Sequence, residues 1–277
     1  MGLRIATNIA SQSVQKNLKE VSNAGNAQLE KLSSGKRITK ASDDAAGLAI
    51  ATNLEAQTKG LRQATRNAND GISLVQTAEG GLNETSNILV RLRELTVQAA
   101  SDTVGEQERG FLDKEYKQLT KEVDRISEST TFNGSQLLNG KGKGSMDFQV
   151  GAFAGEQNKI TFDTGMTNSS ASSIGISGTG IAEKSDALDA ISNVDSAIAK
   201  VSGQRADLGS IQSRLGSTVK NLETQTINQD SARSVIQDVD VAEASATLAS
   251  NNVVKNAAVS TLAQANQIPM SALRLIG

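Results

Sequence analysis

The clearest hydrophobic pattern lies in the last third of the chain, where apolar residues recur every seven positions. The main series is Val194, Val201, Leu208, Leu215 and Leu222. The companion positions of the same heptad are Ile191, Ile198, Arg205, Gln212 and Val219. A heptad pattern this long predicts a helix that packs through one seam, a line of inward-facing positions, in a bundle or coiled coil. Polar residues at two seam positions lower stability but can fix the register.

A second seam precedes it and predicts a long helix from about Ala45 to about Ala100. Its apolar positions are Leu61, Ala68, Ile72, Val75, Leu82 and Leu89. Asp43 and Asp44 precede this helix, and a carboxylate there can accept free amide hydrogens and suit the helix dipole. Paired carboxylates also suit calcium, but a cap explains them more simply. Within the helix, Gly80-Gly81 is either a tolerated weak spot, or a place where small residues permit close contact with a neighbouring helix or a small change in bend.

A third helix is predicted after a turn at 101–105. Its seam is Leu112, Tyr116, Leu119, Val123 and Ile126. Because the connection is short, we expect this helix to fold back antiparallel.

The character of the sequence changes between residues 130 and 182, which are rich in Gly, Ser, Thr and Asn. Met146, Phe148 and Val150 alternate with polar residues, as do Ile160 and Phe162, and this pattern predicts a β-hairpin. Residues 163–182 contain few apolar side chains, so we expect an exposed loop or a second short hairpin. The serines from 169 to 173 are candidate acceptors of sugars, and a plain solvated loop explains them equally well.

Both ends of the chain carry apolar positions that their own segment cannot cover. The N-terminal seam has one apparent slip near Gly25 and consists of Val14, Leu18, Val21, Leu29 and Leu32. Near the C-terminus, the large apolar residues lie on more than one face of the predicted helix: Leu248, Val253, Val254, Val259 and Leu262. Apolar groups on several faces predict burial on several sides, and hence a subunit of a larger assembly.

Composition narrows the possible functions. The 277 residues include no Cys, no His and no Trp, and the net charge is −2. The chain therefore lacks the residues most used for zinc binding and for acid–base catalysis, and we expect no enzyme, metal or cofactor. Charges of both signs are mixed and aromatic residues are scarce, which argues against nucleic acid as a partner. No apolar run reaches the length of a membrane span, and the first residues do not resemble a cleaved secretory signal.

Four ordered motifs resemble the signature of bacterial flagellin. They are Leu32-Ser33-Ser34-Gly35-Lys36-Arg37-Ile38-Thr39-Lys40-Ala41-Ser42-Asp43-Asp44-Ala45-Ala46-Gly47-Leu48-Ala49-Ile50, Arg66-Asn67-Ala68-Asn69-Asp70-Gly71-Ile72-Ser73 with Gln76-Thr77-Ala78-Glu79-Gly80, Phe132-Asn133-Gly134, and Leu262-Ala263-Gln264-Ala265-Asn266-Gln267-Ile268-Pro269. The resemblance covers about residues 3–162 and 183–277.

This resemblance implies a mainly α fold, an elongated helical bundle or coiled coil built from the N- and C-terminal halves, with a small β-hairpin region in the middle. Residues 1–42 and 235–277 would form terminal helices in the inner core of a filament. Residues 43–140 and 183–234 would form the bundle core. Residues 141–182 would hold the hairpin and an exposed loop, with no large variable domain.

The implied function is that of a structural subunit, exported and self-assembled into the flagellar filament for swimming motility. The alternative is a structural protein of the hook–filament junction. The implied location is extracellular, reached without a cleaved signal peptide. The implied partners are other flagellin subunits, a flagellin export chaperone, and filament cap and hook-junction proteins, with no membrane insertion.

A further implied partner is the host Toll-like receptor for flagellin. The residues that match the family's receptor motif are Arg91, Leu95, Gln98 and Glu115. The competing interpretation is that the same face packs against a neighbouring subunit in a filament.

Overall fold

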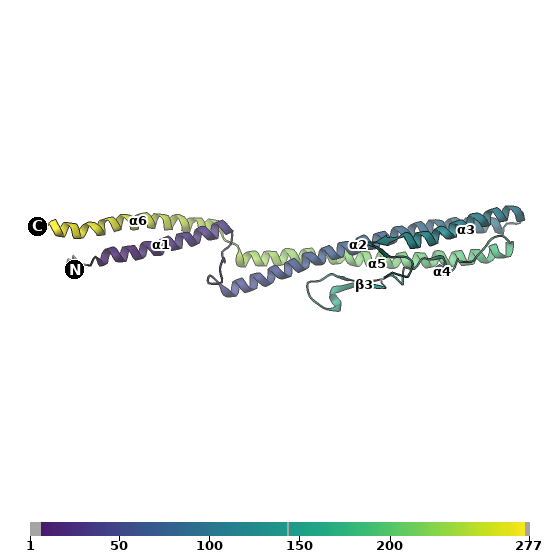
Figure 1. The fold of residues 1–277 in the computed structure, drawn as a ribbon, viewed down its shortest axis with the longest axis horizontal. Helices are drawn as coiled ribbons and strands as arrows, with labels where there is room; N and C mark the ends of the chain where they lie inside the picture. Colours follow the sequence, from purple (N-terminus) through teal and green to yellow (C-terminus); the bar gives the residue numbers. More distant parts are fainter. Residues whose placement is uncertain (1–6, 143, 275–277) are drawn as a thin grey trace. The chain divides into compact units, whose positions relative to one another are not determined.

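The computed structural model describes residues 7–142 and 144–274, with side chains described as far as Gln267. Its long helices are α1 (Ile9–Ser34), α2 (Ala45–Ala100), α3 (Glu106–Ser129), α5 (Lys184–Gln237) and α6 (Val241–Arg274) (Figure 1). The shorter elements are β1 (Thr131–Phe132), β2 (Ser135–Gln136), β3 (Ser145–Gln149), η1 (Glu156–Asn158), β4 (Lys159–Asp163) and α4 (Ala171–Ile174). The predicted mainly α class, a helical bundle with a small β region, is confirmed.

The chain divides into two compact units. The first combines the residues up to Ala56 with those from Asn228 onward, and the second spans Gln57–Ile227. The divisions fall inside α2 and α5, whereas the sequence placed its boundaries at 42/43 and 234/235. The β-hairpin and the segment after it belong to the second unit together with the bundle, because they share its core.

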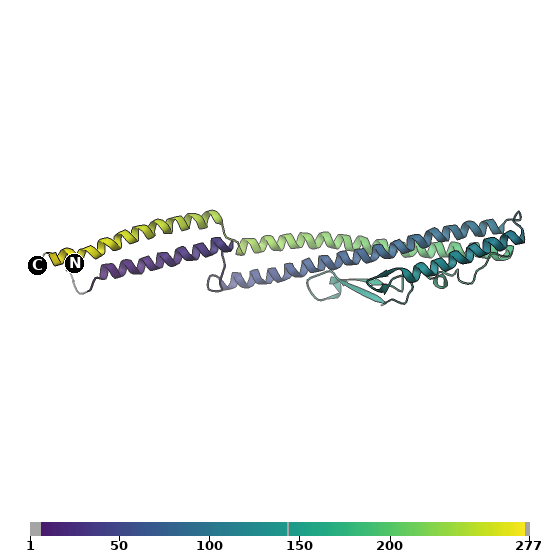
Figure 2. The same ribbon diagram turned by 45° about the horizontal axis from the view of Figure 1, so that its top comes forward.

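The first unit contains α1 and α6, which lie side by side and run antiparallel (Figures 1 and 2). Asn8 caps α1, since its side-chain oxygen accepts a hydrogen bond from the Ser11 backbone N–H at 3.0 Å. Asp240 caps α6 in the same way, accepting from the N–H groups of Ala242 and Glu243. Each helix therefore begins where a side chain replaces a missing backbone acceptor.

The start of α2 follows the same logic and resolves the two interpretations of its carboxylates. Asp44 Oδ1 accepts a hydrogen bond from the Gly47 N–H at 2.8 Å, so Asp44 is the helix cap. Asp43 instead closes the turn before the helix, where its Oδ2 accepts from the N–H groups of Thr39 and Lys40. Both side chains thus serve local backbone structure.

The second unit is built around α2, α3 and α5, whose apolar positions share one core. Its largest fully buried side chains include Leu82, Leu89, Leu92, Tyr116 and Leu208. Arg109 at the start of α3 donates to the carbonyl oxygens of Ala99 and Ser101, which closes the C-terminal end of α2. α3 folds back along α2 as expected (Figure 2).

The predicted β-hairpin is formed by β3 and β4, which pair antiparallel with Met146 opposite Phe162 and Phe148 opposite Ile160. A second, shorter hairpin of β1 and β2 was not predicted. Its two-residue turn is Asn133-Gly134, where both residues have positive φ (47° and 75°). Asn-Gly between strand residues is a strong signal for a tight hairpin turn. The Phe132-Asn133-Gly134 motif is therefore the sequence feature from which this hairpin can be predicted.

Residues 163–182, here called the strap, are packed on the bundle, and the prediction of an exposed loop is wrong. Ile174, Ile176 and Ile181 are at most 1% exposed. Three contacts fix the strap to α3: the Ala171 N–H donates to Asp124, Thr179 bonds Tyr116, and the Ile181 N–H donates to Asp113. The few apolar residues suffice because α3 and α5 supply the rest of the core.

Gly80 and Gly81 have different roles, although they are adjacent. A Cβ at Gly81 would lie 2.6 Å from both Leu138 Cδ1 and Thr130 Oγ1, so Gly81 allows the segment after α3 to pack closely on α2. A Cβ at Gly80 would meet nothing within 4 Å. Gly81 therefore permits a close contact, although its neighbour is the segment after α3 and not a helix, and Gly80 has no such neighbour.

Candidate functional site

The α1–α6 pair is the first candidate for a functional surface, because its seam is narrow and polar. On α1 the inward positions follow a heptad without interruption: Ser11, Val14, Leu18, Val21, Gly25, Gln28 and Leu32. On α6 they are Ala244, Leu248, Asn251, Ala258, Leu262 and Ala265. Of these residues, only Ser11, Ala244 and Ala265 are buried, and the others are half-buried. Small and polar residues at half the positions leave the pair with little apolar burial of its own.

The expected slip near Gly25 does not occur. Gly25 and Gln28 occupy seam positions in place of larger apolar residues, which is why the pattern looked broken in the sequence. Leu29 lies next to the seam rather than in it, and its side chain is 55% exposed. Of the predicted α1 residues, Val14, Leu18, Val21 and Leu32 therefore face α6, and Leu29 faces outward.

Hydrogen bonds fix the register at the far end of this pair. The Asn8 side-chain amide donates to the Ala265 carbonyl at 2.9 Å. The Ser11 hydroxyl donates to the Asn266 side-chain oxygen at 2.8 Å. Directional polar contacts specify one alignment of two helices better than a uniform apolar seam does.

At the other end lies the junction, defined as residues 35–44 and 236–240. Here the two connecting segments form a short antiparallel bridge between Lys36 and Asp238. The Arg37 N–H donates to the Gln237 carbonyl at 2.7 Å, and the Val239 N–H donates to the Gly35 carbonyl at 3.1 Å. The Arg37 guanidinium donates to the Ile236 carbonyl, which closes the last turn of α5.

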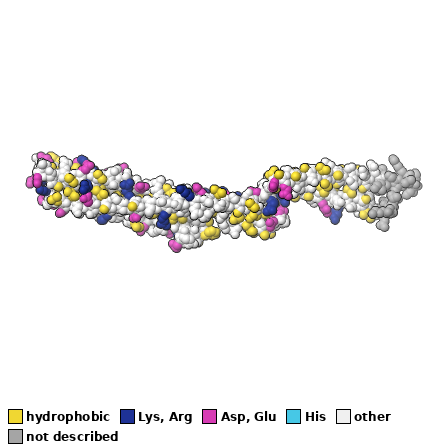
Figure 3. All heavy atoms as spheres, turned by 180° about the vertical axis from the view of Figure 1, so that it is seen from behind, with side chains coloured by type: hydrophobic (Ala, Val, Ile, Leu, Met, Phe, Trp, Pro, Cys, Tyr) yellow, Lys and Arg dark blue, Asp and Glu magenta, His cyan; other side chains and the backbone are white. Residues whose placement is uncertain are grey.

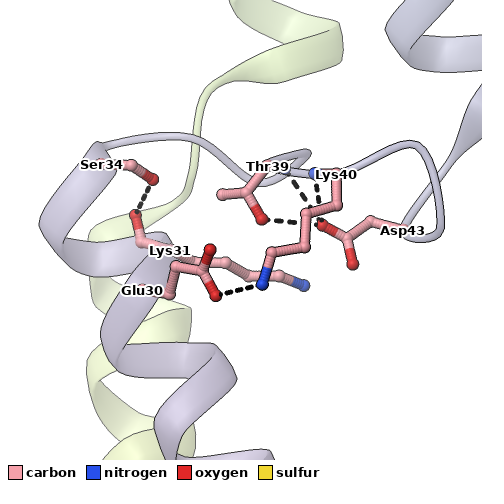
Figure 4. A network of polar contacts seen from close by, with 6 residues as sticks. All are labelled: Glu30, Lys31, Ser34, Thr39, Lys40 and Asp43. Atoms are coloured by element: carbon pink, nitrogen blue, oxygen red, sulfur yellow. Dashed lines mark hydrogen bonds and ion pairs between the residues drawn. The ribbon is translucent and has the colours of Figure 1, made fainter.

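Figure 4 shows the polar network on the α1 side of the junction. Asp43 Oδ2 accepts from the Thr39 N–H (3.1 Å), the Thr39 hydroxyl (2.9 Å) and the Lys40 N–H (3.1 Å). These hydrogen bonds, led by the one from the Thr39 backbone, lower the pKa of Asp43. The Lys40 ammonium donates to Glu30 at 2.8 Å, and that contact raises the pKa of Lys40. The network gives the connector a defined conformation between α1 and α2.

The outer surface of α6 is uncovered and nearly uncharged. Val253 is 69% exposed, Val254 46% and Val259 51%, whereas Leu248 and Leu262 are half-buried against α1. Between Ala244 and Gln267, Lys255 is the single charged residue. In Figure 3 the visible face of the helical pair is mostly hydrophobic or neutral, with charged side chains gathered toward the junction. A solvent-exposed helix ordinarily carries many more charges on its outer face.

The predicted bundle residues lie where a core requires them. Eight are at most 4% exposed: Val75, Leu82, Leu89, Val194, Val201, Leu208, Leu215 and Leu222. Ile72 is half-buried and packs against the same core. The polar seam residues Arg205 and Gln212 are half-buried, and in the described part of the chain the buried Nε of Arg205 has no hydrogen-bond partner. This arrangement supports the expectation that they lower stability.

The predicted receptor surface is only partly a surface. Arg91 and Glu115 are exposed and form an ion pair of 2.8 Å between α2 and α3, and Arg91 also pairs with Glu94. Gln98 is exposed on the same helix. Leu95 is 1% exposed, so its assignment to this surface is wrong. It points into the core of the second unit with its neighbours Leu92 and Ala99, which follow the same helical spacing.

Among the described residues, no group of three His, Cys, Asp or Glu side chains is placed to hold a metal ion. Within the same residues, no helix combines the length and the apolar character needed to cross a membrane.

Ser169, one of the candidate sugar acceptors, is fully buried, while Ser172 and Ser173 are exposed.

Comparison with known proteins gives matches at both ends of the chain. The family model described as the bacterial flagellin N-terminal helical region matches residues 5–143, and the one described as the C-terminal helical region matches residues 191–276. The flagellin of Halalkalibacterium halodurans is 41% identical over 269 residues, which cover 97% of this chain and 98% of the relative. The flagellin of Bacillus subtilis is 37% identical, covering 99% of this chain and 100% of the relative.

Solved structures agree with these matches. The crystal structure of Bacillus cereus flagellin superposes with a TM-score of 0.51 at 31% identity, covering 61% of this chain and 94% of that one. A putative flagellar hook-associated protein from Vibrio parahaemolyticus superposes with a TM-score of 0.58, covering 70% of this chain and 99% of that one. At 17% identity the second likeness speaks for a shared fold alone.

Proposed function

The chain belongs to the bacterial flagellin family and is a structural subunit of the flagellar filament, and we propose that the outer surface of its α1–α6 pair builds the filament's inner core. The observation that carries the proposal is the uncovered, nearly uncharged surface of α6, with Val253, Val254 and Val259 exposed. Burying an exposed valine side chain contributes about 1.5–3 kcal/mol, so a few such residues per subunit make a substantial contact.

Filament growth requires an assembly that does not close on itself. In such an assembly one patch of a subunit contacts a different patch of the next, and the contact repeats without end. We propose that α6 supplies one patch and the bundle of the second unit supplies others. Arg91, Gln98 and Glu115, which lie on an exposed face of that bundle, belong to these assembly contacts.

We further propose that the two ends of the chain are disordered in the free subunit and fold when it joins the filament. The seam between α1 and α6 is half polar or small, and ordering the backbone costs about 1–2 kcal/mol per residue. Contacts with neighbouring subunits are therefore needed to stabilise the pair. Limited proteolysis of the free subunit and of the filament tests this proposal, and equal resistance of the ends in both forms would contradict it.

A finer set of partners follows from the family. We propose export without a cleaved signal peptide to an extracellular filament, with a flagellin export chaperone, a filament cap and hook-junction proteins as partners. Recognition by the host Toll-like receptor for flagellin would use Arg91, Gln98 and Glu115 on the free subunit, with Leu95 holding α2 in place from the core. Flagellins are structural proteins, so no catalytic activity is assigned.

Truncation separates assembly from folding. A chain that ends at Asn252 loses the part of α6 that carries Val253, Val254 and Val259, while the whole second unit remains. We expect it to keep the circular dichroism spectrum of a folded bundle and to form no filaments in electron micrographs. Normal filaments from the truncated chain would refute the role given to α6, and loss of the bundle signal would show that the two units do not fold independently.

A further inference from the structure

Two Asn-Gly pairs lie six residues apart, at 133–134 and 139–140, and the structure gives them opposite surroundings. Asn133 is exposed at the turn between β1 and β2, and it has a positive φ of 47°. Among the described residues, no hydrogen bond is found to its side chain. The following Gly134 is exposed as well and has nothing within 4 Å of the position of a Cβ.

Asn139 is held at both ends of its side chain. Its amide Nδ2 donates to Gln136 Oε1 at 2.6 Å, and its Oδ1 accepts from the Lys141 N–H at 2.9 Å. The residue is 9% exposed. To react, Asn139 must first break both hydrogen bonds, whereas Asn133 has none to break.

We propose that Asn133 is a site of spontaneous deamidation. The Gly134 backbone nitrogen attacks the side-chain carbonyl carbon of Asn133, a new C–N bond forms, and the bond to Nδ2 breaks. Ammonia leaves with the proton from the Gly134 amide, and a five-membered succinimide remains. Water then opens the ring at one of its two carbonyl carbons, which yields either aspartate or isoaspartate at position 133.

The hairpin that carries this turn controls the reaction. β1 and β2 pair through only two residues on each strand, Thr131 with Gln136 and Phe132 with Ser135. So short a hairpin opens readily compared with the core of a helical bundle. Opening releases Asn133 from its left-handed conformation and lets the Gly134 nitrogen reach the side chain, since glycine has no side chain to obstruct the approach.

The product changes the turn permanently. Isoaspartate adds one atom to the backbone path between residues 133 and 134, and a two-residue turn of this kind depends on its backbone geometry. Either product also adds one negative charge. The hairpin lies beside Leu137 and Leu138, which are fully buried, so its loosening is expected to reach the edge of the core.

The test follows deamidation in the intact folded protein. The full-length chain is incubated at mildly alkaline pH, digested at intervals, and analysed by mass spectrometry with fragmentation that locates the modified residue and distinguishes isoaspartate. We expect Asn133 to convert at least about tenfold faster than Asn139, which corresponds to about 1.4 kcal/mol of additional opening free energy at Asn139. An Asn133→Gln variant should lose the conversion at position 133 and keep that at position 139 unchanged.

A second variant tests the cause of the difference. Gln136→Ala removes the acceptor of the Asn139 amide, so the rate at Asn139 should rise toward that of Asn133. Two results would overturn the proposal: conversion of Asn139 as fast as that of Asn133 in the folded wild-type chain, or conversion of Asn133 no faster than that of asparagines that do not precede glycine.

Discussion

Alanine substitution at Gly80 and at Gly81 should change stability in opposite directions. Replacing glycine by alanine inside a helix stabilises it by about 0.5–1 kcal/mol, because the unfolded chain loses conformational freedom. At Gly80 the new methyl group meets nothing within 4 Å, so Gly80→Ala should show this gain in full.

At Gly81 the same gain is outweighed by steric overlap. The new Cβ would lie 2.6 Å from Leu138 Cδ1 and from Thr130 Oγ1. Leu138 is fully buried, and the Thr130 hydroxyl donates to the Ile126 carbonyl at 2.8 Å, so neither neighbour can move freely. Overpacking costs about 1–3 kcal/mol, and after the helix gain Gly81→Ala should lower the free energy of unfolding by about 1–2 kcal/mol.

Urea and thermal unfolding, followed by circular dichroism, measure both variants against the wild type. For a unit of this size each kcal/mol shifts the melting temperature by about 2–4 °C. The double variant Gly81→Ala with Leu138→Ala should show favourable coupling, since the smaller residue removes the overlap with Leu138 and leaves the one with Thr130. Equal stabilisation by Gly80→Ala and Gly81→Ala would refute the reasoning, because it would mean that nothing packs against Gly81.

Three further outcomes are expected. Hydrogen bonds lower the pKa of Asp43 below its ordinary value, so its stabilisation of the junction is fully present above that ordinary value and is lost as the pH falls through the lower pKa of the folded state. Hydrogen exchange at the Thr39 and Lys40 amides should become faster as this stabilisation is lost, and exchange rates that Asp43→Asn leaves unchanged would contradict the prediction. Leu95→Ala should lower the free energy of unfolding, measured in urea, by about 2–5 kcal/mol, and Gln98→Ala should hardly change it. Similar small effects of the two substitutions would mean that Leu95 lies at the surface. Val253→Asp should leave the circular dichroism of the free subunit unchanged and raise the protein concentration needed for polymerisation, whereas polymerisation at the wild-type concentration would exclude Val253 from the contact.

The sequence predicts the bundle well because its seams are long and apolar. The heptad spacing alone predicts that the series from Val194 to Leu222 is buried in the core, and the structure buries it. The hairpin of β3 and β4 follows equally from simple alternation.

The strap was missed because its burial depends on groups that sequence patterns do not weigh. Thr167 and Ser169 are buried although they are polar, since their hydroxyls donate to the carbonyls of Leu137 and Leu138. Ile174, Ile176 and Ile181 stand among glycine, serine and threonine residues at uneven spacing, so they form no periodic series. Tyr116 and Val123 on α3 complete their surroundings, and that pairing becomes visible only in the folded chain.

The α1 seam shows the converse problem. Gly25 and Gln28 hold inward positions without being apolar, so a pattern of apolar residues alone puts Leu29 in the seam in their stead. The family motif puts Leu95 on a surface, although its spacing from Leu92 and Ala99 is that of a core position. In both cases the position of a residue on the helix predicts whether its side chain faces inward better than the residue type or the motif does.

The central claim is that this chain polymerises through its terminal helices. Electron microscopy of the purified full-length protein after salt-induced polymerisation tests it most directly. The account predicts long filaments of uniform width that the chain ending at Asn252 does not form. Amorphous aggregate or dispersed subunits from the full-length protein, or filaments from both chains, would contradict it.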